Sequence, residues 1–129
     1  MATFITLEQL LKLHVIVINH SGGSQGVRDM GRLDAAVAVQ AQEVFGEELY
    51  KSIYEKSAAI IRGIIGDHPF VDGNKRTGML AGLTLLEVND IKVSIKKGDL
   101  EDFAVRVAVD KLDVAEIARW LEAKSRLKK

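Results

Sequence analysis

Hydrophobic residues near the start of the chain recur at helical spacing. Thr6 and Gln9 form a capping-box pattern, after which one face carries Leu7, Leu10, Leu11, His14 and Ile18. A helix is therefore predicted from about Leu7 to Ile18. The run HVIVI within it is rich in β-branched residues and would also suit a short strand, but the long periodic lead-in favours the helix.

The stretch from Ser21 to Gly31 interrupts this pattern. It contains four glycines in eleven residues, which predicts a mobile loop or a small hairpin. Beyond it, a second helix that stops at Gly46 is predicted from one apolar face, made of Leu33, Val37, Gln40 and Val44.

Two strongly apolar segments occupy the middle of the chain. Residues 47–65 carry two neighbouring apolar stripes, which predicts a helix with other elements on more than one side. From Arg76 onward the run TGMLAGLTLLEV is almost wholly apolar, and its interleaved Gly78, Ala81 and Gly82 would let another helix approach closely. These two segments are predicted to be the central helices of the fold.

The C-terminal third contains shorter patterns. After a polar break at residues 89–90, the alternating run IKVSI predicts a short half-buried strand that pairs with little else. Asp99 is predicted to cap the next helix, and Asp113 with Glu116 repeats the capping pattern before a last helix, whose end the basic tail KSRLKK suits. The prediction is one domain over residues 1–129, a mainly all-α, compact bundle of six helices with a flap loop or small hairpin.

Composition and charge exclude several classes of protein. A length of 129 residues suits a single core, and 18 basic residues balance 18 acidic ones, so no overall field favours nucleic acid or an anionic membrane. The absence of cysteine excludes thiolate catalysis and disulfides. The N-terminal segment lacks the features of a signal peptide, and its apolar run is broken by polar residues. A cytoplasmic protein is expected, with no direct contact to nucleic acid or membrane.

One loop between the two central helices, HPFVDGN, concentrates the candidate chemistry. Pro69 stops the incoming helix, Asp72 and Gly73 supply a turn, and Phe70 is the apolar anchor expected to hold the loop on the core. The next helix begins near Asn74, so its first backbone N–H groups form a candidate anion site.

Charged residues around this helix start indicate a negative ligand. Lys75 and Arg76 add two cations where the helix dipole is already positive. With His68 and Asp72, the loop contains a general base, a metal-ion ligand and phosphate clamps, as phosphoryl or nucleotidyl transfer requires. Taken singly, each residue also has a structural interpretation: a cap for Asp72, solvated cations, and a structural imidazole for His68.

The other two histidines are not expected to take part in chemistry. His14 falls on the apolar face of the first helix and is predicted to be a core histidine, whereas His20, beside the glycine-rich loop, is predicted to be exposed. No pair of histidines has the spacing of a zinc site.

The same residues resemble a known family. HPFVDGN resembles the first part of the Fic motif, and the following NKRT resembles its variant in the Doc (death-on-curing) toxins. The segment GGSQGVRDMGRLDAAVA is similar to the segment after the first helix of Doc proteins, so the resemblance to the Fic/Doc family covers nearly the whole chain.

The resemblance implies a reaction and a role for each motif residue. Fic proteins usually transfer AMP from ATP, whereas Doc members bind ATP in the reverse direction and pass on the γ-phosphate. The implied roles are a catalytic base for His68, a magnesium ligand for Asp72, and phosphate binding by the Gly73–Lys75 backbone and the Asn74 side chain, beside the cation Arg76 that the charge pattern already indicates. Lys75 replaces the glycine of AMP-transferring enzymes, where it would fill space and attract the terminal phosphate.

The implied function is that of a toxin in a toxin–antitoxin system. It would phosphorylate a Ser or Thr hydroxyl of a translation factor, elongation factor Tu, using ATP and Mg²⁺, and a separate antitoxin protein would block it. Met79, Leu80 and Gly66 depart from the family patterns, so AMP transfer and a catalytically silent antitoxin-binding module remain alternatives. Arg62, one turn before Gly66, is a candidate to reach the site from the same helix. The loop from Ser21 to Gly31 is either a flap that docks the target or a plain solvent loop.

Overall fold

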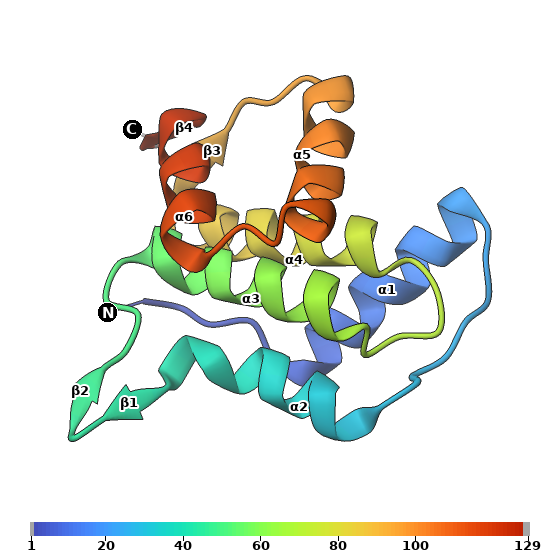
Figure 1. The fold of residues 1–129 in the computed structure, drawn as a ribbon, viewed down its shortest axis with the longest axis horizontal. Coiled ribbons are helices and arrows are strands. Elements are labelled where there is room, and N and C mark those ends of the chain that lie inside the picture. The colour runs from blue at the N-terminus through green and yellow to red at the C-terminus, as the bar shows by residue number, and fades with distance from the viewer. Residues whose placement is uncertain (1, 128–129) are drawn as a thin grey trace.

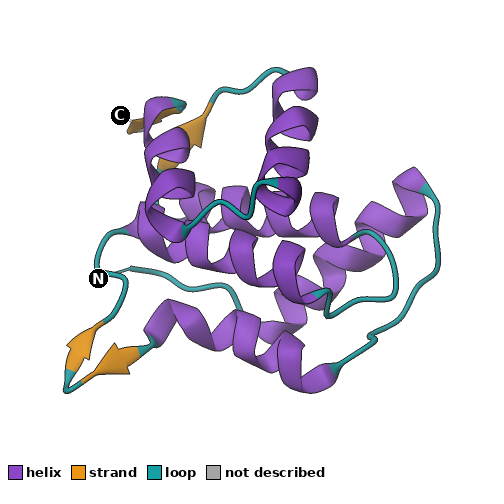
Figure 2. Ribbon diagram, viewed as in Figure 1, coloured by secondary structure: helices purple, strands orange, loops and turns teal. Residues whose placement is uncertain are grey.

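The computed structural model describes residues 2–127 and confirms a mainly helical fold (Figure 1). Four short strands and a 3-10 turn, η1 (Val39–Ala41), complete the secondary structure of these residues (Figure 2). The helices are α1 (Leu7–Ser21), α2 (Met30–Ala38), α3 (Ile53–Asp67), α4 (Asn74–Val88), α5 (Lys97–Val109) and α6 (Val114–Ala123). The strands are β1 (Glu43–Val44), β2 (Glu47–Glu48), β3 (Ile91–Val93) and β4 (Ser125–Leu127).

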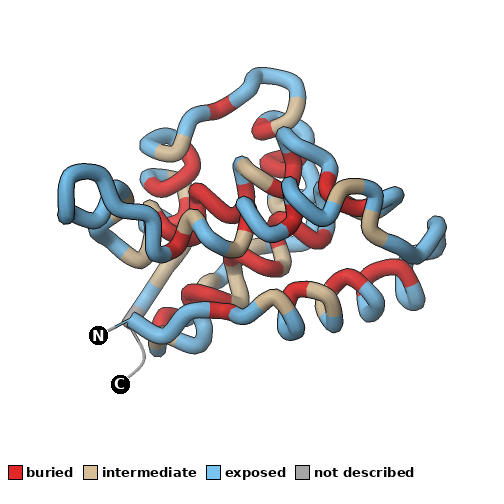
Figure 3. Tube along the Cα trace, turned by 90° about the horizontal axis from the view of Figure 1, so that it is seen from below, coloured by how far each residue is buried: buried red, intermediate tan, exposed pale blue. Residues whose placement is uncertain are grey.

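Helices α3 and α4 form the centre of the fold. On one side, Ile60 and Ile64 of α3 belong to an apolar cluster shared with α1 and α2; on the other, Ile61 and Ile65 belong to a cluster shared with α5 and α6. The prediction that elements cover the third helix on more than one side is therefore confirmed, and buried residues concentrate in this central region (Figure 3).

Glycines on α4 allow the two central helices to lie close together, as predicted. A Cβ added to Gly78 would lie 2.9 Å from Ile65 Cγ1, and one added to Gly82 would lie 2.5 Å from Ile61 Cγ1. Side chains at these positions would collide with α3, so the small residues determine how closely α3 and α4 pack.

The second helix ends earlier than predicted. Helix α2 stops at Ala38, and the prediction that Val44 continues the helical face up to a stop at Gly46 is wrong. Glu43 instead pairs with Glu48 in a two-stranded hairpin, β1–β2, whose turn residues Phe45 and Gly46 have φ of 53° and 80°. Two consecutive left-handed residues fit the twist of a two-residue hairpin, so Gly46 serves that turn and not a helix end.

Two helix starts also differ from the prediction. Helix α3 begins at Ile53 and not at residue 47, because Ser52 and Glu55 form a reciprocal capping box. Helix α5 begins at Lys97, two residues before the predicted cap, so Asp99 lies in its first turn, where its charge suits the helix dipole. The capping box of Asp113 and Glu116 is confirmed.

The basic tail forms a strand where a helix end was predicted. Helix α6 stops at Ala123, and β4 pairs antiparallel with β3, so that Val93 lies opposite Ser125. The predicted strand at residues 91–95 therefore exists in shorter form and does have a partner. Residues 128–129 of the predicted tail lie outside the described residues. Within residues 2–127, the helices are too short or too polar to traverse a lipid bilayer.

Candidate active site

Two stacked, buried rings anchor the loop between α3 and α4 to the core. Phe70 is fully buried, as predicted for an anchor, and its ring stacks on His14 with centroids 3.8 Å apart. His14 is only 3% exposed, which confirms the core prediction, but its Nε2 also lies 2.8 Å from the carbonyl oxygen of Asp72. The buried imidazole thus links helix α1 to the loop that carries the candidate chemistry.

Asn74 braces the loop from inside. Its Oδ1 accepts a hydrogen bond from Phe70 N–H, and its Nδ2 donates to the Phe70 carbonyl, both at 3.0 Å. The same Nδ2 lies 3.5 Å from His68 Nδ1, at the outer limit of a hydrogen bond, and because an amide N–H group only donates, a bond there has Nδ1 as its acceptor. Because this side chain is engaged within the loop, the part of Asn74 that remains for a ligand is its backbone N–H.

His68 ends helix α3 in an unusual backbone conformation. It has φ 50° and ψ 59°, in the left-handed region, and its side chain is exposed. Its carbonyl accepts a bond of 2.7 Å from Arg28 Nε, while Arg28 Nη2 donates to the Asp67 carbonyl at 2.8 Å. Arg32 Nη1 also donates to Asp67 O, so two guanidinium groups satisfy the carbonyls at this helix end.

The segment before α2 lies alongside the loop. Arg28 and Asp29 donate their N–H groups to the Pro69 carbonyl, and Val71 donates its own to Gly26. These contacts form an isolated antiparallel bridge between Val27 and Phe70. The segment 26–29, which belongs to the predicted flap, therefore already has backbone partners within the chain.

Asp72 does not cap helix α4, so the structural interpretation considered for it is wrong. Its Oδ2 accepts a 2.8 Å bond from Ser24 N–H across the loop, and its side chain is exposed. The N-cap position belongs to Gly73, with φ 76°, where a Cβ would lie 2.9 Å from Ile18 Cδ1. Glycine is required here by both the left-handed backbone and the contact with α1.

The structure brings all six predicted site residues to one polar pocket of about 370 Å³. The predicted residues His68, Asp72, Gly73, Asn74, Lys75 and Arg76 all line it. Because the first bond of α4 runs from Thr77 N–H to Gly73 O, the N–H groups of residues 74–76 have no partners within the helix. A carboxylate, an imidazole, free amides and two cations thus border one space, which can bind a phosphate chain beside a proton acceptor.

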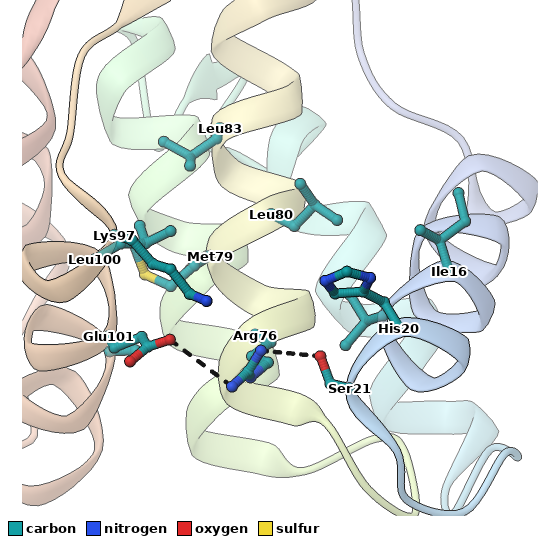
Figure 4. A pocket seen from close by; sticks show the side chains of 12 residues that line it. Ile16, His20, Ser21, Arg76, Met79, Leu80, Leu83, Lys97, Leu100 and Glu101 are labelled. Carbon is teal, nitrogen blue, oxygen red and sulfur yellow. Dashed lines mark hydrogen bonds and ion pairs between the residues drawn. The ribbon is translucent and has the colours of Figure 1, made fainter.

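Arg76 lies between this pocket and a second, apolar groove. Figure 4 shows its guanidinium between Ser21 of α1, at 2.9 Å, and Glu101 of α5, at 3.8 Å. The groove, about 250 Å³, runs between α1, α4 and α5, and its lining includes Ile16, Leu83 and Leu100. His20 also lines this groove, and its side chain is exposed, as predicted.

Comparison with known proteins identifies the family. The family model for the Fic/DOC family matches residues 4–86, which contain α3, the loop and all of α4 except its last two residues. The chain belongs to the Fic/Doc family. It is 37% identical over 102 residues to "Toxin Doc" of Mycolicibacterium smegmatis, covering 78% of each chain. It is 32% identical over 117 residues to "Protein kinase doc" of Escherichia phage P1, covering 91% of each.

The departures of this Fic/Doc chain from its family patterns lie outside the polar pocket. Met79 is 2% exposed, and it and Leu80 line the apolar groove. Gly66 lies on α3, where a Cβ would meet nothing within 4 Å. None of these three residues lines the space around the α4 N-terminus.

Asp72 fits the magnesium ion that membership of the Fic/Doc family implies, as a single protein ligand. In the described part of the chain its Oδ1 accepts no hydrogen bond, and Oδ2 accepts one. Mg²⁺ in nucleotide sites takes one or two carboxylates and completes its shell with phosphate and water oxygens. No group of three or more His, Asp or Glu side chains in residues 2–127 is arranged to hold a metal alone.

Sequence reasoning missed three residues of the Fic/Doc site. Arg28 and Arg32 bind the end of α3, and His14 binds the loop backbone. One local feature could have indicated the arginines. Helix α3 has no basic residue in its last turn, so its last carbonyl groups need hydrogen-bond donors from other parts of the chain. Which arginines supply them is decided by the path of the segment before α2.

Proposed function

We propose that this Fic/Doc protein is the toxin of a toxin–antitoxin system, which acts in the cytoplasm by transferring the γ-phosphate of ATP to a Ser or Thr hydroxyl of elongation factor Tu. The observation that carries the proposal is the polar pocket, where His68 and Asp72 face the uncapped start of α4 together with Lys75. The names "Toxin Doc" and "Protein kinase doc" of its two relatives support the biological role and the reaction class.

The pocket residues divide the reaction between them. The triphosphate binds with its terminal phosphate at the N–H groups of residues 74–76, and Lys75 and Arg76 balance its charge. The acceptor oxygen forms a bond to the γ-phosphorus, the bond from that phosphorus to the bridging oxygen breaks, and ADP leaves. The hydroxyl proton passes to the ring nitrogen of His68 that carries no hydrogen. A magnesium ion held by Asp72 would neutralise charge on the phosphates.

Lys75 favours γ-phosphate transfer over AMP transfer. Its side chain is exposed at the first turn of α4 and lines the pocket at the point where AMP-transferring relatives have glycine. A long cation there occupies space and attracts the more highly charged end of the triphosphate.

Isotope position in ATP tests the proposal. Purified protein is incubated with elongation factor Tu and ATP labelled at either the α- or the γ-phosphate. Label is expected on the factor from the γ position alone. Label from the α position alone would replace the kinase proposal with AMP transfer, and no label with retained growth arrest would favour a silent binding module.

Arg28 is expected to set the rate by positioning His68. Arg28→Ala removes two hydrogen bonds to the carbonyls of residues 67–68, which frees the end of α3 to shift, and transfer is expected to fall about 10- to 100-fold. Steady-state kinetics measure this, with a lower kcat and an unchanged KM for ATP. Arg119→Ala, on the exposed face of α6, is the control. A wild-type kcat in Arg28→Ala would remove the positioning role.

The antitoxin is proposed to cover the apolar groove beside the pocket. The groove shares Val17, Ser21 and Arg76 with the polar pocket proposed to bind ATP, here called the nucleotide pocket. A protein segment bound in the groove would therefore also obstruct ATP. Its mostly apolar lining suits the apolar face of a partner helix.

Leu83→Glu tests this position for the antitoxin. Leu83 is half-buried in the groove and does not line the nucleotide pocket, so the variant is expected to arrest growth as the wild type does. Rescue by the co-expressed antitoxin is expected to fail, because the charge would be buried against an apolar partner. Val105→Glu, at an exposed position of α5 outside the groove lining, is the control for the added charge. Full rescue of Leu83→Glu would place the antitoxin elsewhere.

A further inference from the structure

A second polar pocket lies on the other side of His68. It has a volume of about 390 Å³ and lies between the C-terminal half of α3 and the connection from α5 to α6. His68 lines both this space and the nucleotide pocket, and no other lining residue is common to the two. Gly66 of α3 carries no side chain where it lines this space, and a Cβ added there would meet nothing within 4 Å.

The charges in this pocket are mostly positive and lack protein partners. Arg62 and Lys111 line it with exposed side chains, and within residues 2–127 neither forms an ion pair or a hydrogen bond through its side chain. Asp67 is the one acidic residue in the lining. Asp110, next to Lys111, pairs instead with Arg106, at 4.0 Å.

Two further observations support a binding role. Lys111 has φ 49°, an uncommon left-handed conformation for a lysine, in the tight connection between α5 and α6. Arg28, whose guanidinium binds the carbonyls of residues 67–68, adds a third cation near the end of α3 that pairs with no carboxylate in the described chain. The surface that Arg62 and Lys111 form beside His68 is therefore complementary to a negatively charged group.

We propose that Arg62 and Lys111 form a subsite for an acidic side chain of the acceptor protein, close to the hydroxyl that receives the phosphate. The inference rests on the proposed function. In-line transfer puts the attacking and leaving oxygens on opposite sides of the phosphorus. If the donor phosphates bind at the α4 N-terminus, in the one pocket that His68 lines, the other pocket that His68 lines is left for the acceptor, and Arg62 and Lys111 border it.

The subsite belongs to the acceptor and not to ATP. The groups proposed to bind the donor phosphates are the N–H groups at the start of α4 and the side chains of Lys75 and Arg76. They all border the pocket at the α4 N-terminus, and none of them lines the pocket of Arg62 and Lys111. An acidic residue beside the acceptor hydroxyl would contact Arg62 and Lys111. The subsite would then raise affinity for the acceptor and the rate of encounter with it.

A double substitution tests the subsite in the full-length protein. Arg62→Ala with Lys111→Ala is assayed with γ-labelled ATP and purified elongation factor Tu, varying each substrate in turn. The KM for the factor is expected to rise about tenfold, with kcat and the KM for ATP unchanged. The dependence of kcat/KM on salt concentration is expected to be weaker than in the wild type, since screened charges have been removed.

A control variant that also loses two positive charges distinguishes loss of the subsite from the change in net charge. Lys92→Ala with Arg119→Ala removes two exposed cations that line neither pocket, and wild-type kinetics are expected. An unchanged KM for the factor in the Arg62 and Lys111 variant would overturn the subsite. A raised KM for ATP would assign the pocket to the nucleotide and overturn it as well. A wild-type protein that transfers no γ-phosphate would overturn the proposed function, and the subsite with it.

Discussion

Replacing His68 with alanine is expected to abolish growth arrest and to slow phosphate transfer about 100- to 10,000-fold, the usual contribution of a general base. The side chain is exposed and lines the polar pocket proposed to bind ATP, so its loss would remove the proposed proton acceptor without opening a cavity in the core. ATP binding is expected to persist, because the free amides of α4 and the cations Lys75 and Arg76 remain. The measurement is transfer of γ-label in single turnover, together with the dissociation constant for ATP.

His68→Asn tests whether the loss of activity in His68→Ala comes from a change in backbone structure. His68 has a left-handed backbone, which asparagine tolerates better than alanine, so His68→Asn keeps the helix end but not the base. Both variants are expected to be inactive. His20→Ala, an exposed histidine in the neighbouring groove, is the matched control and is expected to arrest growth normally. Growth arrest by His68→Asn at the wild-type level would reject base catalysis and support a binding module.

Replacing Gly82 with alanine is expected to lower the free energy of unfolding by roughly 1–3 kcal/mol, the usual cost of overpacking a core. The new Cβ would lie 2.5 Å from Ile61 Cγ1, closer still to Ile61 Cδ1, and 3.2 Å from the Ser57 carbonyl oxygen. Ile61 is fully buried, so it cannot swing into solvent, and helix α3 must move away from α4. Denaturant unfolding measures the change as a lower midpoint.

The same substitution in an open helix provides the control. Gly98 lies in the first turn of α5 with nothing within 4 Å of an added Cβ, so Gly98→Ala is expected to stabilise the protein by about 0.5–1 kcal/mol. If Gly82→Ala lowers the free energy of unfolding and Gly98→Ala raises it, contact between α3 and α4, and not helix propensity, controls the loss of stability at Gly82. An unchanged midpoint for Gly82→Ala would mean that the two helices are not so closely packed.

The central helices and the loop between them were predictable because their signals are local. The paired apolar stripes of α3, the small residues of α4 and the break at Pro69 each depend on neighbours within a few residues. The shortened α2 and the late start of α3 were mispredicted where two local signals competed. Gly46 can end a helix or turn a hairpin, and Ser52 with Glu55 was a capping box that the apolar pattern concealed.

The sequence alone determined that His68, Asp72 and the start of α4 lie within one short loop, because residues so close along a chain cannot be far apart in space. Only the tertiary structure decided what surrounds that loop. Arg28 reaches the His68 carbonyl across 40 positions of sequence, and His14 reaches the Asp72 carbonyl across 58. The tertiary structure likewise joins Arg62 to Lys111 in a second pocket and pairs β3 with the tail. Such contacts depend on how helices pack, and packing is set by the whole core and not by the spacing of residues along one segment.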